Sequence, residues 1–204
     1  MAYQKYPFQS YLTMPWKNGG GVTREIVKVV DEGGGLLWRL SLATIAASGP
    51  FSSFPGLQRI IVALAGDRVT LHGFEGGAVV LLPNEPLSFS GDHAVTATLE
   101  GSADDFNVMF DPKAVELSFV VQRLTEGQAP TFPRNADHRI LFVSEGALSI
   151  GGTALEKYDT LTIEGHLGDV VRATQASIVF LITASRKINI TAKVQGLGNG
   201  SSND

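Results

Sequence analysis

The sequence predicts an all-β protein made of two related halves. Apolar runs of mostly about 4–8 residues, rich in Val, Ile, Leu and Phe, recur along the chain. Gly, Pro, Asp or Asn separate these runs, and no stretch keeps a 3.6-residue period over about 12 residues or more. Short strands at this spacing are typical of a sandwich or a barrel.

Composition narrows the classes of function. The chain has 204 residues, of which 44% are hydrophobic and 18% charged, with a net charge of −4. This balance suits a well-buried globular core and gives no reason to expect nucleic acid or an anionic membrane as a partner. The absence of cysteine excludes a disulfide scaffold, a zinc-thiolate site and a cysteine nucleophile. With no signal peptide and no run of about 20 apolar residues, we expect a cytoplasmic protein. Exposed strands could pair two chains, so we expect a monomer or a homodimer.

The strands of the first half are expected in order between turn-forming residues. They are predicted at 23–30, 36–45, 59–65, 68–72, 78–82, 86–89, 94–99 and 106–110. The first is rich in β-branched residues, and Gly33-Gly34-Gly35 predicts a hairpin turn before the second.

The strands of the second half follow a similar pattern. They are predicted at 115–121, 139–143, 147–150, 160–163, 170–173 and 177–183. Pro130 and Pro133 break strands and indicate a loop at 125–135. The last residues, 196–204, are nearly free of apolar side chains, and we expect them to be disordered.

An internal repeat relates the halves. The run RIIVA at 59–63 is followed by Gly66, and RILFV at 139–143 is followed by Gly146. LSFSG, beginning at Leu87, resembles LTIEG, beginning at Leu161, and each half ends in a strongly apolar strand. Three matches in the same order indicate a duplication. We therefore expect two domains, 1–112 and 113–195, with the junction near residue 112 or in the 125–135 loop.

The sequence carries no recognisable metal or cofactor motif. None of the four histidines, His72, His93, His138 and His166, stands in an HxH, HxxxH or HExxH spacing, so we expect surface or turn histidines and no metal. A site assembled from distant histidines is the open alternative. No nucleophile elbow or P-loop is present, and neither triple glycine opens a helix-like segment that could bind phosphate.

The most unusual segment is MPWKNGGGVTREI at 14–26, which combines an aromatic residue, a cation, an amide and three glycines just before a strand. The simpler interpretation is a loop that Trp16 anchors to the core. In the functional interpretation, backbone N–H groups and Lys17 approach an anionic ligand and Trp16 forms a wall of its site.

Three further segments contain candidate binding residues. Strand alternation places Arg39 and Ser41 on the strand face opposite Trp38. That face points either to solvent, which is the usual case, or into the lumen of a barrel. Arg59 follows an aromatic loop, and an arginine can bond both oxygens of a carboxylate. Asn107 lies within an apolar strand, where either a neighbouring loop or a ligand could satisfy its amide.

Together these segments resemble the HutD/Ves family. The resemblance rests on MPWKNGGGVTREI (14–26), WRLSLATI (38–45), GPFSSFPGLQR (49–59) and DFNVMF (105–110), and it is looser in the second half. It implies a cupin-like double-stranded β-helix with two barrel halves, a bicupin. It also implies a regulatory or protective role in bacterial histidine utilisation, with formylglutamate or urocanate as the expected ligand.

The leading hypothesis is a non-catalytic binder of a small carboxylate at the mouth of the first half. Cations would hold the carboxylate, the amides an amide or formyl oxygen, and aromatic rings the carbon skeleton. The candidate residues are Trp16, Lys17, Asn18, Arg24, Arg39, Ser41, Phe51, Arg59 and Asn107. One alternative is a metal-independent isomerase or hydrolase, for which no clear general base is evident, since Glu25 should face away from Arg24. Another is an interaction module that covers exposed strands.

Overall fold

The structure, a computed structural model, describes residues 3–132, 136–164, 170–187 and 192–195. These residues form β-strands joined by turns, with one short 3-10 helix, η1 (Phe8–Ser10), and no α-helix. Within the described ranges there is no helix whose length and hydropathy would let it cross a membrane. The predicted all-β class is therefore confirmed.

The chain divides into two compact units, which we describe separately. The first unit contains residues 12–112 together with β19 (Ala192–Gln195), and the second contains residues 3–11 and the described residues from 113 to 187. This exchange of terminal segments differs from the expected division into 1–112 and 113–195. The tail at 196–204, expected to be disordered, lies outside the described residues.

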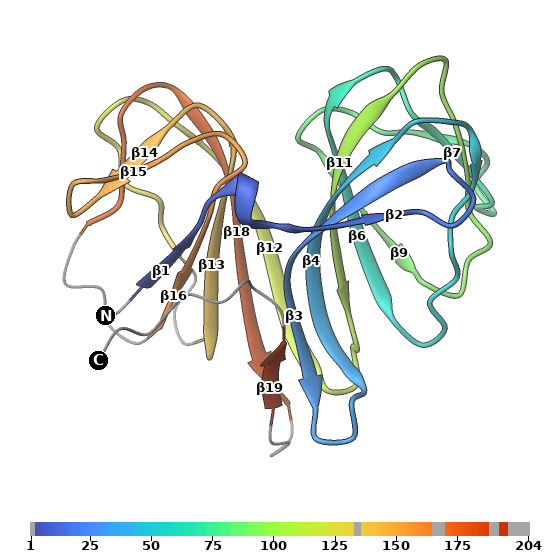
Figure 1. The fold of residues 1–204 in the computed structure, drawn as a ribbon, viewed down its shortest axis with the longest axis horizontal. Coiled ribbons are helices and arrows are strands. Elements are labelled where there is room, and N and C mark those ends of the chain that lie inside the picture. The colour runs from blue at the N-terminus through green and yellow to red at the C-terminus, as the bar shows by residue number, and fades with distance from the viewer. Residues whose placement is uncertain (1–2, 133–135, 165–169, 188–191, 196–204) are drawn as a thin grey trace. The chain divides into compact units, whose positions relative to one another are not determined.

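The first unit consists of two antiparallel sheets (Figure 1). The larger sheet has the order β19, β3 (Gly21–Asp31), β4 (Leu36–Ile45), β11 (Ala103–Phe110), β6 (Gln58–Gly66) and β9 (Pro86–Ser90), and β2 (Leu12–Pro15) also pairs with β3. The smaller sheet has the order β5 (Gly49–Pro50), β10 (Thr96–Thr98), β7 (Thr70–His72) and β8 (Val79–Val80). Both sheets contribute to one buried core that includes Ile61, Leu71, Phe89 and Ala97.

The second unit also has two sheets. The larger has the order β1 (Tyr3–Tyr6), β16 (Thr160–Ile163), β13 (His138–Glu145), β18 (Ser177–Arg186) and β12 (Val115–Leu124). The smaller has the order β15 (Thr153–Leu155), β14 (Leu148–Ile150) and β17 (Arg172–Ala173). Leu141, Leu155, Leu161 and Leu181 lie fully buried in the core that these sheets share.

The two units repeat one topology. The order β4-β11-β6-β9 in the first corresponds to β12-β18-β13-β16 in the second, and β10-β7-β8 corresponds to β17-β14-β15. The pairing of β6 with β11 is irregular between Ala63 and Ala65, and that of β13 with β18 is irregular between Val143 and Glu145. These irregularities fall at matching places in the sequence repeat, directly before Gly66 and Gly146. The related halves are therefore confirmed, although the described sheets stay open and form no closed barrel.

Each strand-like segment predicted from the sequence overlaps a strand of the structure. The predicted ranges 36–45 and 160–163 match β4 and β16 at both ends. The Gly33–Gly35 turn is confirmed, since Asp31 Oδ1 accepts the Gly35 N–H at 2.7 Å. The strands β1, β2, β5, β15 and β19 were not predicted. Each has at most four residues, too few for an alternating apolar pattern to show.

Candidate functional site

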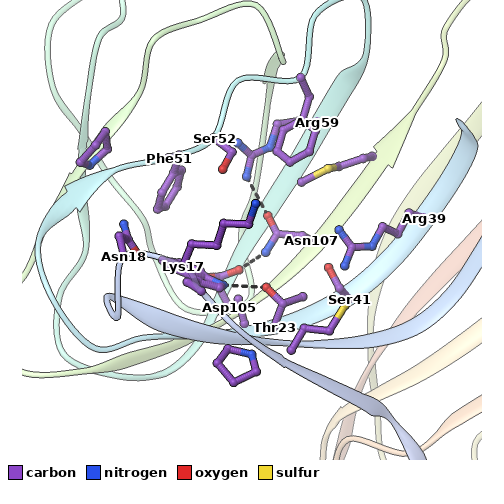
Figure 2. Close-up of a pocket in the computed structure, with 17 residues that line it drawn as sticks. Lys17, Asn18, Thr23, Arg39, Ser41, Phe51, Ser52, Arg59, Asp105 and Asn107 are labelled. Atoms are coloured by element: carbon purple, nitrogen blue, oxygen red, sulfur yellow. Dashed lines mark hydrogen bonds between the residues drawn. The ribbon is translucent and has the colours of Figure 1, made fainter.

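The first unit contains a pocket of about 700 Å³ (Figure 2). Its walls come from the β2–β3 turn and from the loop that follows β5, and its floor comes from the larger sheet. The lining residues are Met14, Pro15, Trp16, Lys17, Asn18, Thr23, Arg39, Ser41, Ala43, Pro50, Phe51, Ser52, Phe54, Arg59, Asp105, Asn107 and Met109.

The strand register places the floor residues in rows across β4, β11 and β6. Met109 pairs with Arg39 on one side and with Arg59 on the other. Asn107 pairs with Ser41 in the next row, and Asp105 pairs with Ala43 in the row after it. Directly paired residues share one face of a sheet, so these polar side chains all point into the pocket.

Arg59 lies at the bottom of the pocket with only 6% of its surface exposed. Its guanidinium carbon stands 5.3, 5.4 and 5.1 Å from the ring centres of Phe51, Phe54 and Phe89, within the range of cation–π attraction. Burial lowers its pKa to about 10, and the Asp105 carboxyl opposes the decrease, so Arg59 stays positively charged at neutral pH.

The hydrogen bond that Arg59 makes to Asn107 does not use its Nε–H. Nη2 donates to Asn107 Oδ1 at 3.2 Å. The buried Nε–H has no hydrogen-bond partner among the described residues. Leaving a buried charged donor unsatisfied is costly, so an acceptor that enters this pocket would be stabilised there.

Asp105 is the second buried charged group of the pocket, with 1% of its surface exposed. Asn107 Nδ2 donates a hydrogen bond to its Oδ1, so the Asn107 amide links the carboxyl to Arg59 (Figure 2). Burial raises the pKa of Asp105 to about 7, while the charge of Arg59 and the hydrogen bond from Asn107 work in the opposite direction. Its carboxyl therefore changes charge near neutral pH.

Arg39 is the other arginine of the floor, and its charge is already paired. Its Nε lies 2.6 Å from Glu25 Oε2, an ion pair without a well-aligned hydrogen bond. The two side chains are 17% and 13% exposed. Because Glu25 compensates Arg39, the two arginines present different electrostatic environments to a ligand.

The β2–β3 turn carries Trp16, Lys17 and Asn18. The Gly19 N–H donates to Trp16 O at 3.0 Å and the Trp16 N–H to Gly21 O at 2.9 Å, which closes a tight turn with Gly19 at a φ of 70°. A side chain on Gly21 would come within 3.0 Å of the Trp16 ring, which packs directly over this glycine. The glycines thus shape the turn, and Lys17 extends from it into the pocket (Figure 2).

A hydrogen bond to a residue of the pocket lining holds the indole of Trp16 in place. Its Nε1 donates to Thr23 Oγ1 at 2.8 Å, and its ring is half-buried. Trp16 therefore anchors the turn to the core cluster and also lines the pocket, while the approach of an anionic ligand to this turn stays a prediction.

All the candidate residues except Arg24 line this pocket. Arg24 precedes Glu25 and follows the pocket residue Thr23, and its Nη1 donates to Thr44 Oγ1 at 3.0 Å. Thr44 in turn donates to Asp104 Oδ1 at 2.7 Å. Strand alternation turns Arg24 away from the side that Thr23 faces, and Arg24 does not line this pocket. Arg39 and Ser41 face the pocket and not solvent.

Sequence reasoning missed several pocket residues, above all Asp105. It stands two residues before Asn107 on the same strand, so the period of two that placed Asn107 could also have placed Asp105. The other missed residues are Met14, Pro15, Thr23, Ala43, Pro50, Ser52, Phe54 and Met109. Most of these side chains are apolar, and an apolar residue does not stand out in strands that are themselves rich in apolar residues.

Each of the three histidines that the structure describes has contacts of its own. His72 Nε2 is 3.0 Å from Thr98 Oγ1, His93 packs against the Phe74 ring, and burial lowers the pKa of His138. His166 lies outside the described residues. Among the residues that the structure describes, no group of three or more His, Cys, Asp or Glu side chains could hold a metal ion.

Comparison with known proteins gives matches over most of the chain. The model of the HutD family matches residues 8–183. A protein from Pseudomonas putida, described as an uncharacterised 21.2 kDa protein in the hutC 3′ region, is 37% identical over 165 residues, covering 78% of this chain and 85% of its own. Protein Ves from Citrobacter koseri is 35% identical over 142 residues, covering 69% and 72%.

Solved structures agree with these matches. HutD from Pseudomonas fluorescens SBW25 superposes with a TM-score of 0.71 at 33% identity, covering 92% of this chain and all of its own. A bacterial pirin from Escherichia coli, in complex with nickel(II), superposes with a TM-score of 0.65 at 12% identity, covering 91% and 100%. The pirin likeness concerns the fold alone, and together with HutD it confirms the expected cupin-like class.

Proposed function

This chain belongs to the HutD family, and from that premise we propose that it is a non-catalytic binding protein for a small carboxylate, with a regulatory or protective role in histidine utilisation. Family membership links the chain to histidine utilisation. The carboxylate ligand and the binding role are the parts that we add from the chemistry of the pocket.

The observation that carries the proposal is the buried guanidinium of Arg59. It stays charged at neutral pH, its Nε–H has no partner among the described residues, and aromatic rings stand near it on several sides. A carboxylate offers two acceptor oxygens that match the fork of an arginine. An anion at this position would satisfy the unused donor and neutralise the buried charge.

The rest of the pocket favours a ligand with a second polar end. Arg39 and Arg59 lie two strand spacings apart, about 10 Å between backbones, and Ser41 and Asn107 line the pocket from the next row of the sheet. A volume of about 700 Å³ lies within the range of small-molecule sites. Formylglutamate, with two carboxylates and a formyl amide, and urocanate, with one carboxylate and an imidazole, both suit these groups.

The experiment is a calorimetric titration of the full chain with formylglutamate, urocanate, histidine and glutamate. We expect saturable binding of formylglutamate or urocanate, with weaker binding of the two free amino acids. A complete lack of saturable binding of any of the four up to millimolar concentration would contradict the proposal.

A second candidate function, a metal-independent enzyme, is favoured by one observation. Asp105 is a buried carboxyl in the pocket with a pKa of about 7, the range that suits a general acid or base at neutral pH. Incubation of the protein with formylglutamate and with urocanate, followed by chromatography of the products, separates the two functions. Turnover that the Asp105→Asn variant loses would favour the enzyme over the binding protein.

A further inference from the structure

The feature that carries the inference is the chain of contacts from Arg59 through Asn107 to Asp105. Arg59 Nη2 donates to Asn107 Oδ1 at 3.2 Å, and Asn107 Nδ2 donates to Asp105 Oδ1. All three residues are at least nine-tenths buried and line the same pocket. The side-chain amide of Asn107 therefore connects a buried carboxyl and a buried guanidinium in a pocket that a ligand can enter.

Charged groups near Asp105 come from each surrounding element. Arg59 approaches from β6 and lowers the pKa of Asp105, whereas Asp104, its neighbour on β11, raises it. Lys17 lines the same pocket from the β2–β3 turn. From β4, Arg39 lines the floor with its charge compensated by Glu25 of β3. The smaller sheet and the loop after β5 place no charged residue in the pocket lining.

We infer that binding of a carboxylate at Arg59 is coupled to the uptake of one proton by the Asp105 carboxyl. The inference rests on the proposed function and adds a regulation by pH to the same site. The positive charge of Arg59 favours the ionised form of Asp105, and a carboxylate bound at Arg59 would neutralise that charge. The bound carboxylate would also place a second negative charge in a poorly solvated pocket. When two carboxylates share one site of this kind, one of them retains a proton.

The direction of the pH dependence follows from linkage. In the free protein Asp105 has a pKa of about 7, and the bound anion raises it further. Below about pH 6 the carboxyl is already protonated in both states, and the affinity is constant. As the pH rises above about 7, binding must add a proton to Asp105, and the affinity falls by up to about tenfold per pH unit until the pKa of the bound state is reached.

The experiment is a titration of the full chain with N-formylglutamate, whose carboxyl groups stay ionised above about pH 6. Binding is measured by calorimetry from pH 5.5 to 8.5, and near pH 7.5 in buffers of different ionisation enthalpy, which give the number of protons taken up. We expect uptake of roughly 0.7 proton per ligand at pH 7.5, because a carboxyl with a pKa of about 7 is only about three-quarters ionised in the free protein at that pH. We also expect a wild-type affinity about ten times lower at pH 8.5 than at pH 6.

The matched variant is Asp105→Asn, which retains an acceptor for Asn107 without a titratable proton. We expect it to bind N-formylglutamate with an affinity independent of pH and with no proton uptake. Uptake that persists in a folded Asp105→Asn protein would assign the proton to another group and overturn the inference. If this variant does not fold, the wild-type proton count and pH profile still decide.

Two outcomes separate this inference from the proposed function. Saturable wild-type binding with no proton uptake and no pH dependence would overturn the coupling and leave carboxylate binding intact. No binding of N-formylglutamate, urocanate, histidine or glutamate at any pH would overturn both.

Discussion

Arg39 and Arg59 lie in one row across the larger sheet of the first unit, on either side of Met109. Glu25 compensates the charge of Arg39, whereas Arg59 is surrounded by the rings of Phe51, Phe54 and Phe89 and keeps an unpaired Nε–H among the described contacts. The sheet therefore presents two cations of the same kind with different roles. Arg59 is the group that a carboxylate would satisfy first.

Replacing Arg59 with Met should weaken binding of N-formylglutamate by about 10- to 100-fold, because charge-assisted hydrogen bonds contribute about 1.5–3 kcal/mol each. Calorimetry of the purified variant measures the change. The matched control is Arg24→Ala, which removes an arginine of β3 that bonds Thr44 and does not line the pocket. Equal losses in the two variants would show that net charge, and not the position of Arg59, determines binding.

Replacing Glu25 with Gln should strengthen carboxylate binding several-fold, since it releases the charge of Arg39 for the ligand. The same change should lower the free energy of unfolding by about 1–3 kcal/mol, because the pair is mostly buried and Arg39 would lose its compensating charge. Titration and urea unfolding measure the two effects. Weaker binding in this variant would instead indicate that Glu25 holds Arg39 in its binding position or contacts the ligand itself.

Asp105 should make the stability of the first unit depend on pH. Its pKa is about 7 in the folded protein and about 4 in an unfolded chain. Between about pH 4 and pH 7, the Asp105 carboxyl is therefore protonated in the folded state and ionised in the unfolded state. The stabilisation is complete below about pH 4 and is lost as the pH rises through 7, by at most about 4 kcal/mol.

The Asp105→Asn variant cannot lose this proton, so its stability relative to the wild type should increase from pH 5 to pH 8. Urea unfolding followed by tryptophan fluorescence tests this, because both tryptophans, Trp16 and Trp38, belong to the first unit. A difference between the two proteins that stays constant over this pH range would mean that Asp105 has an ordinary pKa.

Asp159→Ala should loosen the N-terminal segment, residues 3–11, from the rest of the second unit and leave the pocket of the first unit unchanged. The Asp159 carboxylate accepts the Phe8 N–H at 2.9 Å and the Glu156 N–H at 3.0 Å, and it lies 2.8 Å from Lys5 Nζ. Loss of these contacts should cost about 2–4 kcal/mol and increase hydrogen exchange in residues 3–11. Lys5→Ala, which removes only the more exposed partner, should cost less. Unchanged exchange in the Asp159 variant would refute this role.

The strand pattern of this chain could be predicted because most of its strands are apolar runs with clear turn residues between them. Two things could not be predicted from the pattern. The strands β1 and β19 have four residues each, and their pairing with the other half of the sequence depends on tertiary contacts that leave no local signal. The open sheets differ from the expected barrels because closure depends on register and twist, which composition does not specify.

The pocket could be predicted in part because its polar residues interrupt apolar strands. Arg59 and Asn107 stand out for this reason, and the structure brings both into one cavity. Arg24 belongs to the same sequence motif as Trp16 and Lys17, but strand alternation directs its side chain to Thr44 and not into the pocket. Asp105 was missed although the same alternation that places Asn107 also places it, and its buried state near Arg59 depends on the fold of β6 against β11.

The central claim is that the guanidinium of Arg59 binds a carboxylate. A crystal structure of the full chain grown with saturating N-formylglutamate tests it most directly. We predict a carboxylate of the ligand in the pocket of the first unit, with an oxygen about 2.7–2.9 Å from Arg59 Nε or an adjacent guanidinium nitrogen. A ligand bound elsewhere with this pocket empty, or one bound here with its carboxylates turned away from Arg59, would contradict the claim.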